Sequence, residues 1–141
     1  MLSVDALAQD AFEPEELASV LDEAGYVTGH EREFSGKSRT FDHVVARTLV
    51  FEDVDGAETY LTWMRGHASE VLGTAEQTKI VPPGSSGAAY KLVRCGTCKK
   101  ELPTYLAGWR RGSTVLWLLA AGSGADSRFG TLARDLDAVL G

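Results

Sequence analysis

The most apolar run of the sequence, residues 109–122 (WRRGSTVLWLLAAG), determines what the rest of the chain must provide. Side chains alternate between the two faces of a strand. Over residues 113–121 both faces are apolar, one carrying Val115, Trp117, Leu119 and Ala121 and the other Leu116, Leu118 and Ala120. A strand that is apolar on both faces needs cover on both. We therefore expect residues 113–121 to form a central strand, covered on both faces by other parts of the chain.

Length and charge narrow the class of protein. The 141 residues suit one domain, 1–141, that buries a core without needing a metal or disulfide. The net charge of −6 lacks the basic footprint of a nucleic-acid-binding protein, so we expect no nucleic-acid partner. No run is long enough to cross a bilayer. No signal-peptide pattern occurs at Met1, so we expect either a cytosolic chain or the mature part of an exported protein.

Proline, glycine and capping residues mark where the helices begin and end. Pro14 suits the first turn of a helix, where its missing N–H costs nothing, and Gly25 suits the end of that helix. Apolar residues at helical spacing predict a longer helix over residues 57–72, capped by Asp53 or Asp55. A terminal amphipathic helix follows a cap at Asp126 or Ser127, with its buried stripe at Phe129, Leu132, Ala133, Leu136 and Leu140.

The strands are predicted mainly as hairpins. The expected strands are residues 26–34, 41–51, 78–81, 88–94, 104–110 and 113–121, with a loop over residues 82–87. Residues 1–12 are expected to form a turn of helix or a loosely docked N-terminal arm. Hairpins favour antiparallel pairing. The predicted fold class is therefore α+β, with a mostly antiparallel sheet of five or six strands flanked by helices in the order α-β-β-α-β-β-β-β-α.

Cys95 and Cys98 form a C-x-x-C pair that allows three interpretations. We favour a short-range disulfide, or two idle thiols, at a hairpin tip, since the bridge would form in an oxidising compartment. The pair could instead be half of a zinc site, completed by His30, His43 or His67 or by a second chain. A redox pair is the third interpretation, although the cysteines follow a strand and do not begin a helix.

Basic residues gather between positions 91 and 111, with a tryptophan beside them. This candidate ligand or partner surface consists of Lys91, Arg94, Lys99, Lys100, Trp109, Arg110 and Arg111. Such a surface could meet anionic lipid headgroups, an anionic surface polymer or an acidic protein. The alternative is an ordinary solvated hairpin face.

Four polar or aromatic residues form a candidate pocket between helix and sheet. Trp63 and His67 stand one helical turn apart and can stack, while His43 and Arg47 lie among apolar neighbours on one strand face. They could line a small-molecule site. The alternative places them on a helix flank and a sheet edge.

The chain contains no nucleophile elbow, phosphate-binding loop or paired-carboxylate arrangement. We therefore predict a non-enzymatic binding or sensor-like domain with no cofactor, no metal and no predicted oligomeric state. The alternatives are a cytosolic zinc-binding protein that uses Cys95 and Cys98, or a small thiol–disulfide redox protein.

Several short segments carry a resemblance to a known group. They are residues 25–29 (GYVTG), 32–34 (REF), 50–53 (VFED), 56–61 (GAETYL) and 108–115 (GWRRGSTV), followed by the closing amphipathic helix. Their order resembles actinobacterial extracytoplasmic proteins, namely small lipoproteins of unknown function and the ectodomains of membrane serine/threonine kinases. The resemblance implies a helix-flanked antiparallel sheet of PsbP-like type and a sheet surface or cleft that binds a ligand. It also implies an extracytoplasmic location, with any lipid anchor outside this chain. It carries no catalytic residues, and this chain has one C-x-x-C where family members have distant cysteine pairs.

Overall fold

The computed structural model describes residues 3–9, 14–35, 41–68, 75–78, 82–92, 103–122 and 124–140. Its elements, in chain order, are α1 Val4–Gln9, α2 Pro14–Ala24, β1 Tyr26–Ser35, β2 His43–Phe51, α3 Val54–Gly66, β3 Ala75–Gln77, β4 Ser85–Leu92, β5 Thr104–Arg111, β6 Thr114–Ala121 and α5 Ala125–Leu140. The predicted α+β class and the predicted order of elements are confirmed.

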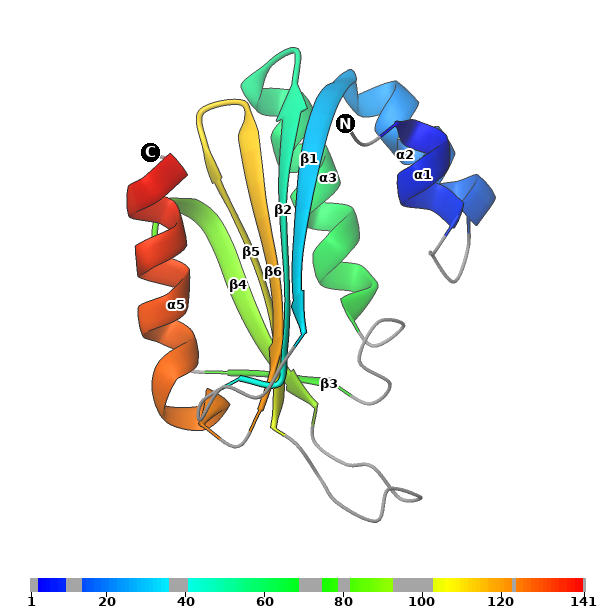
Figure 1. Cartoon of the computed structure of the whole chain (residues 1–141). Helices are drawn as coiled ribbons and strands as arrows, with labels where there is room; N and C mark the ends of the chain where they lie inside the picture. The colour runs from blue at the N-terminus through cyan, green and yellow to red at the C-terminus, as the bar shows by residue number, and fades with distance from the viewer. Residues whose placement is uncertain are drawn as a thin grey trace.

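The six described strands form one antiparallel sheet in the order β1-β2-β6-β5-β4-β3. β6 lies at its centre, paired with β2 on one side and β5 on the other, with Trp117 opposite Arg47 and Gly108. Helices cover both faces, α5 on one and α3 on the other, with α1 and α2 beyond α3 (Figure 1). The expectation that residues 113–121 form a covered central strand is therefore confirmed.

The two faces of β6 belong to two separate hydrophobic clusters. Val115 and Trp117 pack toward α1, α2 and α3, in a cluster that includes Leu21 and Leu61. The intervening residues face α5, in a cluster made of Ala89, Tyr105, Ala107, Trp109, Leu116, Leu118, Ala120, Ala125, Phe129 and Ala133. Full burial of a large apolar side chain contributes about 1.5–3 kcal/mol, so the two clusters are the main source of stability.

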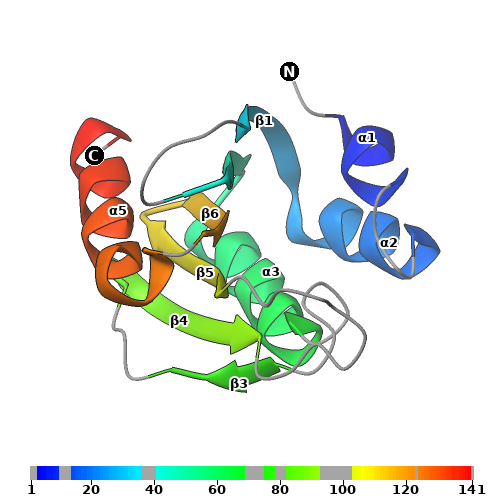
Figure 2. The ribbon, with the colours of Figure 1, turned by 60° about the horizontal axis from the view of Figure 1, so that its bottom comes forward.

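The helices α2 and α3 begin where the sequence predicts. α2 begins at Pro14, and Gly25 follows it with a φ of +74°, a conformation that costs glycine little. Asp53 caps α3, accepting a hydrogen bond from the Gly56 N–H at 2.7 Å. α3 ends at Gly66, where the His67 N–H bonds to the Met64 carbonyl, and the predicted end at Leu72 lies outside the described residues. Figure 2 shows α3 lying along the sheet and α2 beside it.

Three other boundaries differ from the sequence prediction. β4 begins at Ser85, inside the predicted loop over residues 82–87, with a bulge in its pairing to β5. A short strand, β3, is formed by Ala75–Gln77, whereas of the expected strand at residues 78–81 only Thr78 is described, and it lies outside a strand. α5 begins at Ala125, so Asp126 lies in its first turn, where its carboxylate bonds to the sheet and does not cap the helix. At Asp126 the contacts with Lys91 and Tyr105 outweigh the local capping signal.

We expect Gly56→Ala to destabilise the fold, although alanine normally favours a helix by about 1 kcal/mol over glycine. A Cβ at Gly56 would lie 1.9 Å from the carbonyl oxygen of Ala24, so α2 and α3 would have to separate. The expected loss is about 1–3 kcal/mol in the free energy of unfolding, measured by urea denaturation. Gly66→Ala is the matched control, because a Cβ there meets no atom within 4 Å, and it should leave stability unchanged or slightly raised. Equal stability of the Gly56→Ala variant and the wild type would contradict this account.

Candidate functional site

Arg47 lies at the centre of a row of three side chains that crosses three strands. Glu31 of β1 and Trp117 of β6 are its direct neighbours in the sheet register. The Arg47 Nε donates to Glu31 Oε1 at 2.6 Å, and its Cζ lies 4.5 Å from the Trp117 ring centroid. The Arg47 side chain is 20% exposed. The ion pair and the ring stacking hold the guanidinium plane in place on the α3 side of the sheet.

The charge of this guanidinium acts on two tyrosines. Burial raises the pKa of Tyr60 to about 12, and the positive charge of Arg47 opposes that rise. Burial likewise raises the pKa of Tyr26, again opposed by Arg47. Both phenols therefore keep their proton at neutral pH and remain hydrogen-bond donors. We call the set Glu31, Arg47, Trp117, Tyr26 and Tyr60 the Arg47 site.

Gly29 makes room for the Tyr26 hydroxyl. A Cβ at Gly29 would lie 2.5 Å from that hydroxyl oxygen and 2.7 Å from the carbonyl oxygen of Thr48. Any other residue at this position would push Tyr26 out of place. The glycine in β1 is thus explained by the packing of the Arg47 site, since strands otherwise disfavour glycine.

A continuous run of aromatic rings leads from the Arg47 site to the end of α3. Tyr26, Phe51, Tyr60, Trp63 and His67 follow one another with ring centroids 5.7, 5.7, 6.3 and 4.3 Å apart. The last pair is stacked, with an interplanar angle of 16°. The predicted stacking of Trp63 and His67 is therefore present.

Glu16 of α2 joins both ends of that stacked pair. The Trp63 Nε1 donates to Glu16 Oε1 at 3.2 Å, and the His67 Nε2 lies 3.2 Å from the same oxygen. The His67 Nδ1 lies 2.7 Å from the Trp63 carbonyl oxygen. These contacts tie α2 to the end of α3, and they engage His67 with protein groups on both ring nitrogens.

The four predicted pocket residues all lie on the α3 side of the sheet, but they form two groups. Trp63 and His67 stack in a row with Tyr60, and the charge of Arg47 acts on the Tyr60 phenol. His43 lies four residues from Arg47, at the start of β2, where its Nε2 is 3.7 Å from Glu33 Oε1.

The described residues of the predicted basic surface do not assemble as one surface. Arg110 and Arg111 are adjacent in β5 and so lie on opposite faces of the sheet. Arg110 forms an ion pair with Glu58 of α3, whereas Arg111 forms one with Asp137 of α5. Trp109 is a core residue with no exposed area, so its place on the predicted surface is corrected. The strand alternation separates residues that are neighbours in the sequence.

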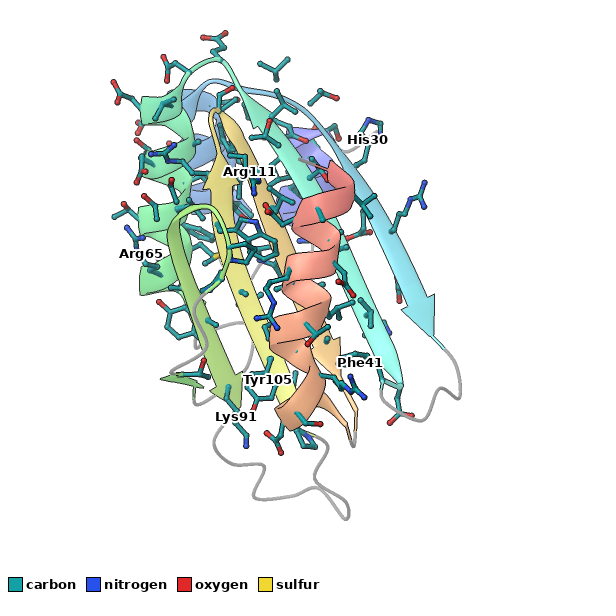
Figure 3. The ribbon with its side chains drawn as sticks, turned by 90° about the vertical axis from the view of Figure 1, so that its left-hand side faces the viewer. His30, Phe41, Arg65, Lys91, Tyr105 and Arg111 are labelled. Atoms are coloured by element: carbon teal, nitrogen blue, oxygen red, sulfur yellow. The ribbon has the colours of Figure 1, made fainter. Side chains whose placement is uncertain are left out.

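Lys91 is also far from the two arginines. It pairs across β4 and β5 with Tyr105, six residues from Arg111, which is about 20 Å along a strand. Its Nζ lies 2.8 Å from Asp126 Oδ1. Figure 3 shows Lys91 and Tyr105 near one end of α5 and Arg111 near the other. Arg94, Lys99 and Lys100 lie outside the described residues, as do Cys95 and Cys98.

Asp137 is the most deeply buried charged side chain in the described chain, at 3% exposure. It accepts a hydrogen bond from Trp109 Nε1 at 3.0 Å and two from the Arg111 guanidinium, the Nε bond at 2.7 Å. The Arg111 guanidinium holds the pKa of Asp137 below its ordinary value of 3.8, with burial opposing and Trp109 assisting. An aspartate near a helix C-terminus is unfavourable by about 0.3–1 kcal/mol, so the tertiary contacts account for its place there.

Glu58 likewise accepts hydrogen bonds from the sheet, on the α3 side. It accepts hydrogen bonds from Ser86 Oγ and from Arg110 Nε, and both bonds lower its pKa. Ser86 adopts a φ of +55°, which is strained for a residue other than glycine. The Arg65 guanidinium donates to the Ser86 carbonyl at 3.0 Å. These contacts hold the β4 bulge against α3, so Arg110 has a structural role.

The structure brings in residues that the sequence did not indicate as site residues. Glu31 was missed because its pairing with Arg47 depends on the register of the hairpin, which the turn residues do not reveal. Trp117 was assigned only to the apolar strand, and Tyr60 only to the apolar stripe of the helix. The spacing of Tyr60, Trp63 and His67 by three and four residues is a signal from which the aromatic run was predictable.

Comparisons with known proteins concern the fold. No protein-family model matches the sequence, and no curated protein matches it. Among solved structures the chain is similar to the extracellular domain of PknH from Mycobacterium tuberculosis, with a TM-score of 0.60 and 14% sequence identity. The match covers 82% of this chain, and the chain spans 65% of that domain. The comparison supports the kinase-ectodomain-like fold that the resemblance implies, a helix-flanked antiparallel sheet.

Among the residues that the structure describes, no group of three or more histidine, cysteine, aspartate or glutamate side chains could hold a metal ion. Over the same residues, no helix combines the length and the apolar character that a membrane span requires.

We expect Asp137→Asn to lower the free energy of unfolding at pH 7 by about 2 kcal/mol, because it removes charge-assisted bonds to a buried carboxylate. A lowered folded-state pKa stabilises the fold above the ordinary value of 3.8, and that contribution is lost as the pH falls through the lowered value. The gap between wild type and variant, measured by urea denaturation from pH 7 to pH 2, should therefore narrow below about pH 4. Asp135→Asn, at an exposed position of the same helix, should change stability by less than about 0.5 kcal/mol at every pH. A gap that stays constant with pH would contradict the assignment.

Proposed function

We propose that this chain is a non-enzymatic, sensor-like binding domain that acts outside the cytoplasm and binds a small molecule at the Arg47 site. The observation that carries the proposal is the fixed guanidinium of Arg47, held between Glu31 and Trp117 and still 20% exposed. A polar group held in one orientation beside aromatic rings is what small-molecule sites use for specificity. Such a group loses little conformational entropy when it binds.

The location outside the cytoplasm rests on the fold. The similar structure is an extracellular domain, and the fold is of the kinase-ectodomain-like type. We further propose that the complete gene product is a lipoprotein-like protein of an actinobacterium, anchored by a lipid outside this chain. A relation to PsbP-like domains belongs to the same proposal.

The three tryptophans of the chain provide separate probes of the binding function. Trp117 lies under Arg47 and Trp63 lies on the aromatic run, whereas Trp109 lies on the opposite face, bonded to Asp137. We expect at least one member of a set of anionic, neutral and cationic aromatic fragments to shift the indole N–H signals of Trp117 and Trp63 saturably. The Trp109 signal should stay in place in the same ¹H–¹⁵N spectra. Unshifted Trp117 and Trp63 signals with every fragment would refute the proposed site.

A reporter fusion tests the location. We expect the complete natural gene product, fused at its C-terminus to β-lactamase and expressed in its native host, to confer ampicillin resistance, because the reporter protects cells only when exported. A fusion of residues 1–141 alone, started with its own Met1, is the comparison that shows whether export depends on sequence outside this chain. An ampicillin-sensitive strain in which the complete fusion is present and hydrolyses nitrocefin after lysis would refute the extracytoplasmic location.

A further inference from the structure

The guanidinium of Arg47 keeps most of its hydrogen-bonding capacity. A guanidinium has five N–H donors, and the one on Nε is used by Glu31. The four donors on Nη1 and Nη2 have no acceptor among the residues that the structure describes. The edge that carries them is the edge that binds a carboxylate or phosphate with two parallel hydrogen bonds.

Tyr60 and Trp117 belong to the same hydrophobic cluster on this side of the sheet. The Tyr60 side chain is 5% exposed, and burial raises the pKa of its phenol to about 12, with the positive charge of Arg47 opposing that rise. Tyr60 therefore contributes a buried, uncharged ring to the site. The donors that a ligand can reach are those of Arg47, whose side chain is 20% exposed.

Resting on the proposed function, we propose that the Arg47 site binds the carboxylate of a small organic acid, with Nη1 and Nη2 of Arg47 donating two hydrogen bonds. The donors demand an acceptor-only group, which an ionised carboxylate is. Charge-assisted bonds are about twice as strong as neutral ones, which favours the acid over its amide.

The neighbouring charges favour a monoanion over a dianion. Glu31 already neutralises the charge of Arg47, so the two side chains together carry no net charge. Glu31 repels every negative charge that a ligand brings, and this repulsion is greater for a ligand with two negative charges than for a ligand with one. A carboxylate carries one negative charge, whereas a phosphate ester carries nearly two at pH 7. Trp63 and Leu119 are partly buried beside the same core and offer apolar contact for the body of the acid.

The test uses three probes that share an aromatic ring, namely phenylacetate, phenylacetamide and phenyl phosphate. Binding is measured at pH 7.5 and constant ionic strength from the Trp117 indole N–H shift. We expect phenylacetate to bind at least about tenfold more tightly than phenylacetamide, which corresponds to one charge-assisted bond. Phenyl phosphate should bind more weakly than phenylacetate.

Three variants assign the effect to residues. Arg47→Gln should weaken phenylacetate binding by about tenfold or more. Arg32→Gln is the matched control. Arg32 is exposed and lies opposite Ala46 in the sheet register, and the Ala46 side chain packs on the α5 side. This variant therefore removes the same charge from the opposite face of the sheet. It should change affinity by less than about twofold. An unchanged Trp109 signal verifies that each variant is folded, and Arg47→Lys, which keeps the charge but loses the fork, should bind with intermediate affinity.

The outcomes separate this inference from the proposed function. If phenylacetamide binds at the Arg47 site as tightly as phenylacetate, or if Arg47→Gln and Arg32→Gln weaken phenylacetate equally, the carboxylate inference is wrong while the binding function stands. Tighter binding of phenyl phosphate than of phenylacetate would replace the carboxylate by a phosphate. If no fragment of any charge moves the Trp117 and Trp63 signals, the binding function itself fails.

Discussion

The burial of β6 on both faces is the constraint on which the rest of the structure depends. Its alternate residues belong to two different clusters, one closed by α3 with α1 and α2 and the other by α5. Removing either layer would expose a row of leucine, valine or tryptophan side chains to water, each at a cost of about 1.5–3 kcal/mol. The helices are therefore required on both sides of the sheet, and the central position of β6 follows.

Three carboxylates, the buried Asp137, the partly buried Glu58 and the exposed Asp126, hold the covering helices to the sheet. Asp137 and Asp126 attach the two ends of α5, and Glu58 attaches α3 to the β4 bulge and to β5. Arg110 and Arg111, which look like a surface patch in the sequence, are used in these attachments. Arg111 bonds to Asp137 through both Nε and Nη2, and Arg110 bonds to Glu58 through Nε and to the Gly112 carbonyl through Nη1. Arg47 uses only its Nε, for Glu31, and the outer edge of its guanidinium has no acceptor in the described chain. That difference in hydrogen bonding separates a structural arginine from a candidate binding arginine.

The predicted pocket was partly right for a physical reason. Trp63 and His67 are one helical turn apart, so their stacking follows from helix geometry alone. Arg47 was recognisable as a charge among apolar residues on one strand face. Its partners were not recognisable, because Glu31 and Trp117 meet it through strand register, which is set by contacts across the sheet. His43 shares the strand face with Arg47 but lies four residues away, beside Glu33.

Local periodicity and composition by themselves determined the α+β class, the start of α2 at Pro14, a helix cap at Asp53 or Asp55 and the central two-sided strand. These features depend on residues that are neighbours in the sequence, so short sequence patterns are enough to predict them. The tertiary structure alone decided which arginine is paired with which carboxylate and the start of β4 at Ser85. Those outcomes depend on contacts between residues 16 to 52 positions apart, such as Arg47 with Glu31 and Arg110 with Glu58, and such distances follow from packing and not from local sequence.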